Sequence, residues 1–386
     1  MFGKPPSFLG VDFGAFGVKV VELKKVKNRP VLHTYGYTAA PTDIHALARL
    51  ARPGGAKAEG ESPAAAAAPG AAAVLPTATA ALAQAEERYG RELREVCRQA
   101  QVLTKTAVAS LPVTAVFHAL LTIPLGDPKN RRAQIEAEAE KLLPYPAAEA
   151  TLDYQVLPPG KAENADKTEQ VLLNAVPREL VTFYTRVFAA AGLKLAALET
   201  EAVALVRSLV GRDEAVVLLL DLGAERTNFF MVEGGVPVTH QSVELGGRQI
   251  AARLESVLGI KGEAVEQLRR DLFVGGANLP AGLNRSKFIE LLAPVLQPLV
   301  KEIEYGMVLY RRESGAAGRA PEKIILTGGA AELPGLSEYL AEQFRLKCYL
   351  GDPWGRVIYQ EGLKPILDDL GPRLAVAIGL ALRGVV

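Results

Sequence analysis

The sequence predicts a two-domain α/β protein with mixed sheets, and three observations lead to this prediction. A buried strand that ends in Asp, any residue and Gly, and then turns back into a second strand, occurs at 10–19 and again at 216–228. Each of these two hairpins is followed by segments with helical periodicity. A third strand, at 323–326, runs into paired glycines. The same order of strands followed by helices occurs twice in the chain, which favours a duplicated α/β architecture.

Composition limits the class of protein. A chain of 386 residues has room for two or three domains, and 49% hydrophobic with 23% charged residues is ordinary for globular proteins. The net charge of +1 provides no overall field that would favour nucleic acid or an anionic membrane. The two cysteines and four histidines show no metal-ligand spacing, so we interpret the histidines as structural or surface residues. No apolar run approaches the ~18 residues of a membrane span, and the N-terminus does not resemble a signal peptide.

The first half begins with two strands within 8–21 and a third at 30–37. Alanine, glycine and proline then dominate 51–83, and prolines there would interrupt any long helix. We expect a flexible surface insertion at this place, with a packed alanine-rich helix as the alternative. Further strands are expected at 106–110, 116–122, 152–157, 169–176 and 194–198, and helices at 84–100, 131–143, 177–191 and 202–210.

The second half repeats the opening of the first. Its expected strands lie at 216–222, 228–233, 237–243 and 323–326, and its expected helices at 246–258, 262–271, 285–292, 294–313 and 372–382. Proline at 294 separates two of these helices, because a proline inside a helix removes a backbone hydrogen bond.

The first hairpin carries a candidate phosphate-binding loop formed by Asp12, Gly14, Ala15, Phe16 and Lys19. Glycines let backbone N–H groups approach a phosphate closely. A carboxylate beside a phosphate normally needs a metal between them, usually Mg²⁺ held through water, so Asp12 is a metal candidate. Lys19 could neutralise a phosphate. A plain β-hairpin with Asp12 capping its turn is the alternative.

The second hairpin repeats the device with Asp221, Gly223, Ala224 and Thr227. The hydroxyl of Thr227 lies near the turn, and Asp221 is the second metal candidate. Two such hairpins heading duplicated domains could face each other across a cleft and hold one triphosphate with its Mg²⁺. The repetition makes nucleotide binding the favoured interpretation of the pair.

Two further glycine pairs are candidates for contact with the nucleotide. Gly328 and Gly329, with Ala330, follow a strand, and backbone exposed there could pack against a base or ribose. Gly246 and Gly247 could lie under the nucleotide or only permit a tight strand–helix turn.

A predicted helix adds two charged candidates. Glu266 and Arg269 lie three residues apart and could reach the ribose and base, with a surface ion pair as the alternative.

The order of these motifs resembles the superfamily of actin, heat-shock chaperone ATPases and sugar kinases. Three segments are similar to the PilM family of type IV pilus assembly proteins, namely GVDFGAFGVKVVEL, QIEAEAEKLLPYP and GPRLAVAIGLALR. The resemblance covers nearly the whole chain apart from 51–83. Ala15 and Phe16 stand where that family often has Ser or Thr, so a hydroxyl for the phosphates is lost, and Arg269 stands where Lys is common.

The resemblance implies an actin-like (ribonuclease H-like) duplicated two-domain fold with a small inserted subdomain, binding ATP with Mg²⁺ between the domains. The domains implied are a first domain at 1–110 with the insertion at 51–83, a small subdomain at 111–176, a return to the first domain at 177–212, a second domain at 213–350 and a C-terminal return at 351–386.

The resemblance also implies a function in pilus assembly and twitching motility. The protein would be a cytoplasmic scaffold, peripheral at the inner membrane, that grips the N-terminal cytoplasmic peptide of a PilN-like membrane protein. Other platform proteins are implied partners, and self-association stays open. The small subdomain would supply the peptide site, with Phe117, Leu142, Leu143 and Tyr145 as candidates. Ordinary core packing is the alternative, and it is favoured for Leu142.

Catalysis is expected to be weak, at most that of a slow ATPase. Glu199 and Glu201 are the carboxylates placed to orient an attacking water, or they only provide charge at a helix N-terminus. The alternatives are an ATP-dependent small-molecule kinase of the same superfamily, a filament-forming actin relative of the cell-division type, and a related secretion-system subunit.

Overall fold

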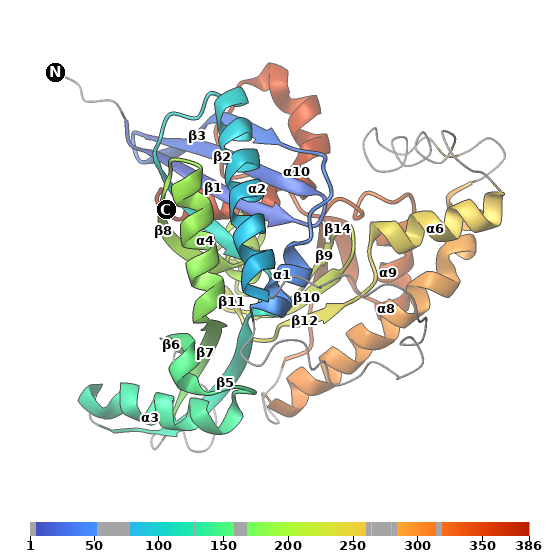
Figure 1. Ribbon diagram of the computed structural model, residues 1–386. Coiled ribbons are helices and arrows are strands. Elements are labelled where there is room, and N and C mark those ends of the chain that lie inside the picture. The colour runs from blue at the N-terminus through green and yellow to red at the C-terminus, as the bar shows by residue number, and fades with distance from the viewer. Residues whose placement is uncertain are drawn as a thin grey trace, which may run out of the picture.

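The computed structural model contains two mixed sheets, each with helices on its faces, and a smaller third sheet at one end (Figure 1). The structure describes residues 5–51, 78–126, 128–157, 168–259, 264, 279, 284–313 and 319–385. Three predicted segments lie wholly or largely outside the described residues. They are most of the insertion at 51–83, the polar segment 160–167 between two expected strands, and most of the helix at 262–271.

The first sheet has the strand order β3-β2-β1-β4-β8. Its strands are β1 (Ser7–Gly14), β2 (Gly17–Val26), β3 (Arg29–Tyr37), β4 (Thr106–Leu111) and β8 (Lys194–Thr200). β1 pairs with β2 in antiparallel and with β4 in parallel direction, and β4 pairs with β8 in parallel direction. The centre of β1 is buried almost throughout, as expected for a strand covered on both faces.

The second sheet repeats this arrangement with the order β11-β10-β9-β13-β14, and β12 also pairs with β10. Its strands are β9 (Val217–Leu222), β10 (Thr227–Glu233), β11 (Val236–Pro237), β12 (Gln241–Val243), β13 (Lys323–Thr327) and β14 (Lys347–Leu350). β9 is antiparallel to β10 and parallel to β13, and β13 is parallel to β14. Matching order and direction confirm the predicted duplication and the actin-like fold class.

Helices cover the outer faces of both sheets (Figure 1). Over the first sheet lie α1 (Ile44–Leu50), α2 (Ala78–Gln99) and α4 (Arg178–Ala190); over the second lie α6 (Gly247–Leu258), α8 (Arg285–Glu313) and α9 (Leu336–Phe344). Phe13 of β1 makes edge-to-face contacts with Tyr89 and Tyr184 at centroid distances of 5.6 and 5.7 Å. Such pairs add to the free energy gained by burial and fix α2 and α4 against the sheet.

Between the two sheets lie α5 (Glu201–Leu205), a π-helical turn (Val206–Val210) and α10 (Lys364–Leu382). Together with residues of β9 and β10 they form a buried apolar cluster, which includes Val217, Phe230, Val376 and Leu380. Because α10 is covered on several sides, its C-terminal half is apolar nearly all round.

The small sheet has the order β5-β7-β6, with both pairings antiparallel. Its strands are β5 (Phe117–Pro124), β6 (Ala150–Val156) and β7 (Thr168–Pro177), and α3 (Pro128–Leu142) covers one face. Ile123, Ile135, Ala139 and Leu173 form its own core. Short 3₁₀ turns at Val113–Ala115 and Ala147–Glu149 precede β5 and β6, and a third lies at Glu361–Leu363. The strands expected at 152–157 and 169–176 are confirmed, and they pair in antiparallel direction as β6 and β7.

The element predictions were wrong in the second half at two places. The two helices expected at 285–292 and 294–313 form the single helix α8, with Pro294 and Pro298 inside it. A continuous apolar stripe, including Phe288 and Leu296, is buried against the second sheet, and this packing outweighs the hydrogen bonds lost at the prolines. The strand expected at 237–243 is split into β11 and β12.

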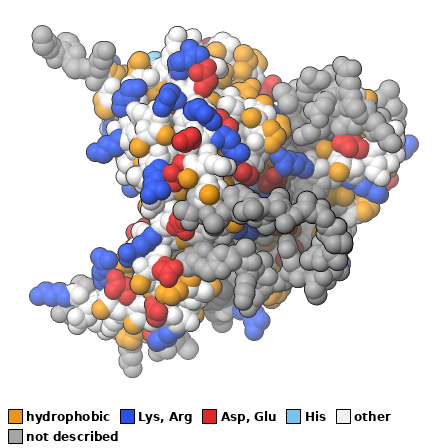
Figure 2. All heavy atoms as spheres, in the orientation of Figure 1, with side chains coloured by type: hydrophobic (Ala, Val, Ile, Leu, Met, Phe, Trp, Pro, Cys, Tyr) orange, Lys and Arg blue, Asp and Glu red, His pale blue; other side chains and the backbone are white. Residues whose placement is uncertain are grey.

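The surface agrees with the near-zero net charge. Figure 2 shows Lys and Arg side chains over α2 and α4 with acidic side chains among them. Within the described part of the chain, none of the helices has the length and hydropathy needed to cross a bilayer.

Candidate functional site

The first sheet presents a row of polar side chains at the end of its buried strands. Asp12 is buried near the end of β1, and Lys19 lies opposite it on β2. Lys19 Nζ lies 2.7 Å from Asp12 Oδ2, and the Ser110 hydroxyl of β4 donates to Asp12 Oδ1 at 2.8 Å. An alanine Cβ at Gly14 would lie 2.6 Å from Lys19 Nζ, so the glycine leaves room for this ion pair.

The second sheet presents the equivalent row. Asp221 of β9 has Asn228 opposite it on β10 and Thr327 opposite it on β13. Asn228 in turn lies opposite Ser242 of β12, whose hydroxyl donates to Asn228 Oδ1 at 2.7 Å. The two aspartates therefore occupy corresponding places in the duplicated sheets.

Glu201, the first residue of α5, completes a group with these aspartates and Lys19. Its buried carboxylate accepts hydrogen bonds from the Val113 N–H and the Asn228 side-chain amide, both at 3.2 Å. The charges of Asp12, Asp221 and Glu201 all raise the pKa of Lys19, so the three carboxylates act on the same ammonium group. We call Asp12, Asp221, Glu201 and Lys19 the carboxylate cluster.

The electrostatics of the carboxylate cluster favour an added cation. Burial and the charge of Asp12 raise the pKa of Asp221 to about 6, against the opposing effects of Lys19 and of a hydrogen bond with Asn228. Burial and the charges of Asp12 and Asp221 hold the pKa of Glu201 well above its usual range. Burial disfavours the charge on Lys19, but the surrounding carboxylates outweigh this effect and its pKa lies above the ordinary value. The three acids have one neighbouring cation in the cluster, so their negative charge is incompletely balanced.

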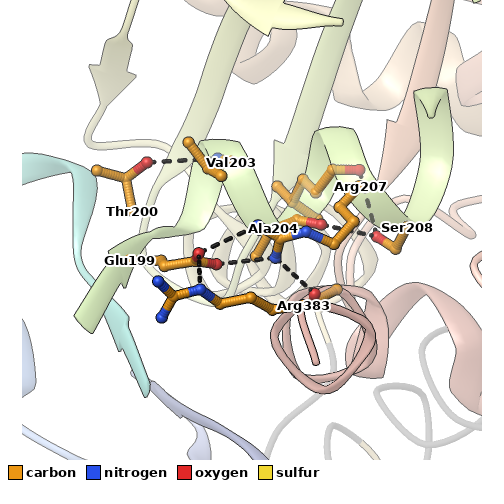
Figure 3. A network of polar contacts seen from close by, with 9 residues as sticks. Glu199, Thr200, Val203, Ala204, Arg207, Ser208 and Arg383 are labelled. Carbon is orange, nitrogen blue, oxygen red and sulfur yellow. Dashed lines mark hydrogen bonds and ion pairs between the residues drawn. The ribbon is translucent and has the colours of Figure 1, made fainter. Parts of the chain in front are cut away.

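Glu199 lies in a different network, shown in Figure 3. Its carboxylate pairs with Arg207 at 2.8 and 3.1 Å and with Arg383 at 3.0 Å. Arg207 also donates to the Gly379 carbonyl at 2.8 Å, which ties the network to α10. The structure therefore brings Glu201, and not Glu199, of the two predicted carboxylates into contact with the site.

The loop after β13 packs directly on Asp221. Gly328 has φ +92°, and a Cβ there would lie 2.5 Å from Asp221 Oδ1. The Ala330 N–H donates to the Leu222 carbonyl at 3.0 Å. Gly329 faces Arg373 of α10, since a Cβ there would lie 3.7 Å from Arg373 Cγ. This loop is thus fitted between β9 and α10, beside the carboxylate cluster.

The loop before α6 is docked on the tip of the second hairpin. The Gly247 N–H donates to the Gly223 carbonyl at 2.9 Å, and the Arg248 N–H donates to the Ala224 carbonyl at 2.8 Å. A Cβ at Gly246 would lie 2.7 Å from the backbone of Ala224. The Gly246–Gly247 pair therefore packs closely against the tip of the second hairpin.

The remaining hairpin residues have defined places. The buried Thr227 hydroxyl donates to the Leu245 carbonyl at 2.7 Å. The Ala15 carbonyl accepts from the Thr42 N–H at 3.1 Å, while the Phe16 side chain is 40% exposed. Glu266 and Arg269 lie outside the described residues.

The oxygen donors around the carboxylate cluster suit a hard cation such as Mg²⁺. In the part of the chain that the structure describes, no three His, Cys, Asp or Glu side chains form a direct metal site. Buried, incompletely balanced carboxylates without direct coordination geometry fit a cation held through water, as the sequence predicted for Asp12 and Asp221.

A cavity of about 350 Å³ lies beside the small sheet, and we call it the aromatic cavity. Its lining residues are Val113, Ala115, Val116, Phe117, His118, Pro144, Tyr145 and His240. Two of the four partner candidates, Phe117 and Tyr145, are among them. Leu143 packs on the core of the small sheet, whereas Leu142 is 49% exposed at the end of α3, so the core interpretation favoured for Leu142 was wrong.

Sequence reasoning missed the histidine pair in this cavity. The rings of His118 and His240 are stacked at a centroid distance of 3.7 Å and an angle of 9°. Burial lowers the pKa of both rings, so each is neutral near pH 7. This contact joins β5 to the segment between β11 and β12. The pair could not be predicted, because no sequence motif relates two residues so far apart in the chain.

Sequence reasoning also passed over Ser110 and Asn228. Ser110 lies within β4 and donates to Asp12, and Asn228 lies within β10, opposite Asp221 in the sheet register. Asn228 could have been identified from the sequence, because a short turn between the two strands of the second hairpin places it opposite Asp221.

Comparison with known proteins adds a family to this geometry. The family model described as Type IV pilus assembly protein PilM matches residues 79–385, which is most of the chain. The chain belongs to the PilM family. A solved structure titled PilM-PilN type IV pilus biogenesis complex has a chain similar to this one, with 23% identity and a TM-score of 0.73, and 98% of each chain is covered.

A more distant structure has the same fold. The ethanolamine utilization protein EutJ from Carboxydothermus hydrogenoformans is 14% identical, with a TM-score of 0.51, and the match covers 99% of this chain and 91% of that one. At this level of identity the likeness concerns the arrangement of sheets and helices alone.

Proposed function

We propose that the protein is an ATP-binding scaffold of the type IV pilus assembly platform, which holds the N-terminal cytoplasmic peptide of a PilN-like membrane protein. Its membership of the PilM family supports this proposal most strongly. The full-length likeness to a chain of a PilM–PilN complex agrees with it. In this proposal the protein is cytoplasmic and reaches the inner membrane through its partner.

The carboxylate cluster is the proposed nucleotide site. Asp12 and Asp221 would order the waters of Mg²⁺, and Lys19 would face the phosphates from β2. A bound Mg²⁺ would supply the positive charge that the cluster lacks. The glycine loops after β1, β9 and β13 would bring backbone close to the nucleotide, with Gly14, Gly223 and Gly328 at the turns.

Turnover of ATP is proposed to be slow or negligible, below the ~1 s⁻¹ of ordinary enzymes. Glu201 is the carboxylate with a place to orient water in the cluster. Burial holds its pKa well above the usual range, which favours the protonated carboxyl, and a protonated carboxyl cannot take a proton from the attacking water.

The aromatic cavity is the proposed site for an apolar anchor of the partner peptide. Its lining combines two aromatic side chains, Phe117 and Tyr145, with neutral histidines and aliphatic residues. A cavity of about 350 Å³ is large enough for one sizeable apolar side chain. Peptides that bind in grooves are commonly held by such anchors.

Replacement of Tyr145 tests this assignment. We expect Tyr145→Ala to weaken binding of the partner's N-terminal peptide by about tenfold, or 1.4 kcal/mol, because one wall of the cavity is removed. The matched control is Tyr154→Ala, since Tyr154 belongs to the same subdomain but is 37% exposed on β6. Titration calorimetry measures both affinities, and circular dichroism checks that both variants are folded. Equal peptide affinity in Tyr145→Ala and wild type would refute the assignment.

A further inference from the structure

The Glu201 side chain lies where the carboxylate cluster and the aromatic cavity meet. Thr200 caps the helix that begins with Glu201, accepting from the Val203 N–H at 3.3 Å, so the backbone of Glu201 is held in place. Its Oε2 atom accepts from two donors on different elements, the Val113 N–H and the Asn228 amide, each at 3.2 Å. A displacement of this one oxygen must lengthen or shorten both hydrogen bonds.

The first hydrogen bond leads to one wall of the cavity. Val113 lines the cavity and begins the 3₁₀ turn Val113–Ala115, which runs directly into Phe117 and His118 of β5. Val113 is buried, so its position is determined by packing and by this bond. A shift of the Val113 backbone therefore moves Phe117 and His118, which lie only a few residues further along the chain.

The second hydrogen bond leads to the opposite wall. Asn228 accepts from the Ser242 hydroxyl at 2.7 Å across the β10–β12 pairing. Ser242 lies two residues after His240, whose ring stacks on His118 and lines the cavity. Both walls, one from each half of the chain, are therefore connected to the same carboxylate by a short chain of hydrogen bonds.

The Glu201 carboxylate also responds to the contents of the cluster. Asp12, Asp221 and Lys19 all act electrostatically on Glu201. Any ligand that changes the charge or the hydrogen bonding beside Asp12 and Asp221 therefore acts on the acceptor that holds both walls. Low-dielectric surroundings make such an interaction stronger than it would be in water.

We propose that Glu201 is a positioning residue that couples occupancy of the carboxylate cluster to the shape of the aromatic cavity. Through it, nucleotide and partner peptide influence each other's affinity, and this influence must be reciprocal. The proposal rests on the proposed function, because it takes the cluster as the nucleotide site and the cavity as the peptide site.

The Val113→Pro variant removes one connection with little change in shape. Pro112 has φ −57° and ψ 136°, the extended conformation favoured before a proline. Val113 is the first residue of the 3₁₀ turn, where a proline is well tolerated. The substitution deletes the N–H that donates to Glu201 and keeps an apolar side chain in the cavity. The matched control is Glu199→Gln, which alters a neighbouring carboxylate that is held by Arg207 and Arg383 instead.

Hydrogen–deuterium exchange with and without Mg-ATP tests the proposal without the partner. In wild type and in Glu199→Gln, we expect Mg-ATP to change the exchange of residues 111–118 and 236–245. In Val113→Pro the change at 111–118 is expected to be lost, while the change at 236–245 persists through Asn228. In Glu201→Ala, which removes the shared acceptor, both changes are expected to shrink.

Three outcomes would overturn the coupling. They are an unchanged response at 111–118 in Val113→Pro, no response in wild type when ATP is bound, and no binding of ATP at all. Peptide titration separates this inference from the proposed function. With the correct peptide, the ratio of affinities with and without Mg-ATP is expected to be ~5-fold or more in wild type and clearly smaller in Val113→Pro, in which only the connection through Asn228 remains. If the exchange results hold but the peptide does not bind, the partner assignment fails and the role of Glu201 stands.

Discussion

At the scale of residues, the candidate site consists of polar side chains at matching places in two buried sheets. Asp12, Lys19 and Asp221 could be predicted because they belong to a motif that occurs twice. The choice between Glu199 and Glu201 could not be predicted. The two residues lie at the end of β8 and directly after it, and only tertiary packing brings Arg207 and Arg383 to Glu199. Contacts of this kind depend on distant parts of the chain.

The Asp221→Asn variant is expected to stabilise the protein in the absence of nucleotide. Burial raises the pKa of Asp221 from 3.8 to about 6, so the folded state holds its proton more tightly than the unfolded state. Asp221 therefore favours folding at low pH, and this contribution is lost as pH rises from about 4 through 6. The difference of about 2 pKa units corresponds to about 3 kcal/mol. This is the largest increase in the free energy of unfolding that the variant should show.

Thermal unfolding between pH 4 and pH 8 measures this effect. The gain is expected to be largest at pH 8 and small at pH 4, because Asp221 is then protonated in the folded state and about half protonated in the unfolded state. The affinity for Mg-ATP should fall ~10-fold or more, because the variant removes a negative charge that would attract Mg²⁺. A variant that is less stable than wild type at pH 8 without nucleotide would contradict the account.

At the scale of elements, strands and long amphipathic helices followed the sequence pattern closely, and short elements did not. The strand β9 begins one residue from its predicted start. The helix α1 and the strand β14 were not predicted, because segments of 7 and 4 residues carry little periodicity. The helix α8 was divided at Pro294, because local propensity does not include the buried stripe that holds it together.

The loop after β13 provides a prediction at this scale. Gly328→Ala is expected to destabilise the protein by about 2–4 kcal/mol, because the added Cβ meets Asp221 and the backbone has φ +92°. Gly234→Ala is the matched control, since Gly234 also has positive φ, +56°, but its Cβ would meet nothing within 4 Å. Its cost should stay near 1 kcal/mol, from backbone strain alone. Chemical denaturation compares the two, and equal losses would show that the loop is not fitted against Asp221.

At the scale of the whole molecule, the duplication could be predicted from the sequence, but the packing of the two halves against each other could not. Two Asp-x-Gly hairpins in one sequence indicated two similar sheets, and the strand orders confirm them. The aromatic cavity brings together Phe117, Tyr145 and His240, which come from separate segments and share no motif. Only the packing of the small sheet against the second half of the chain creates it.

The central claim is that this protein holds a partner peptide as a scaffold. The most direct test is calorimetric titration with the N-terminal cytoplasmic peptide of the cognate PilN-like membrane protein, with and without Mg-ATP. The account predicts saturable binding, with an affinity that depends on the nucleotide, and no binding of a scrambled peptide. Absence of peptide binding in both states, with ATP still bound by the protein, would contradict it.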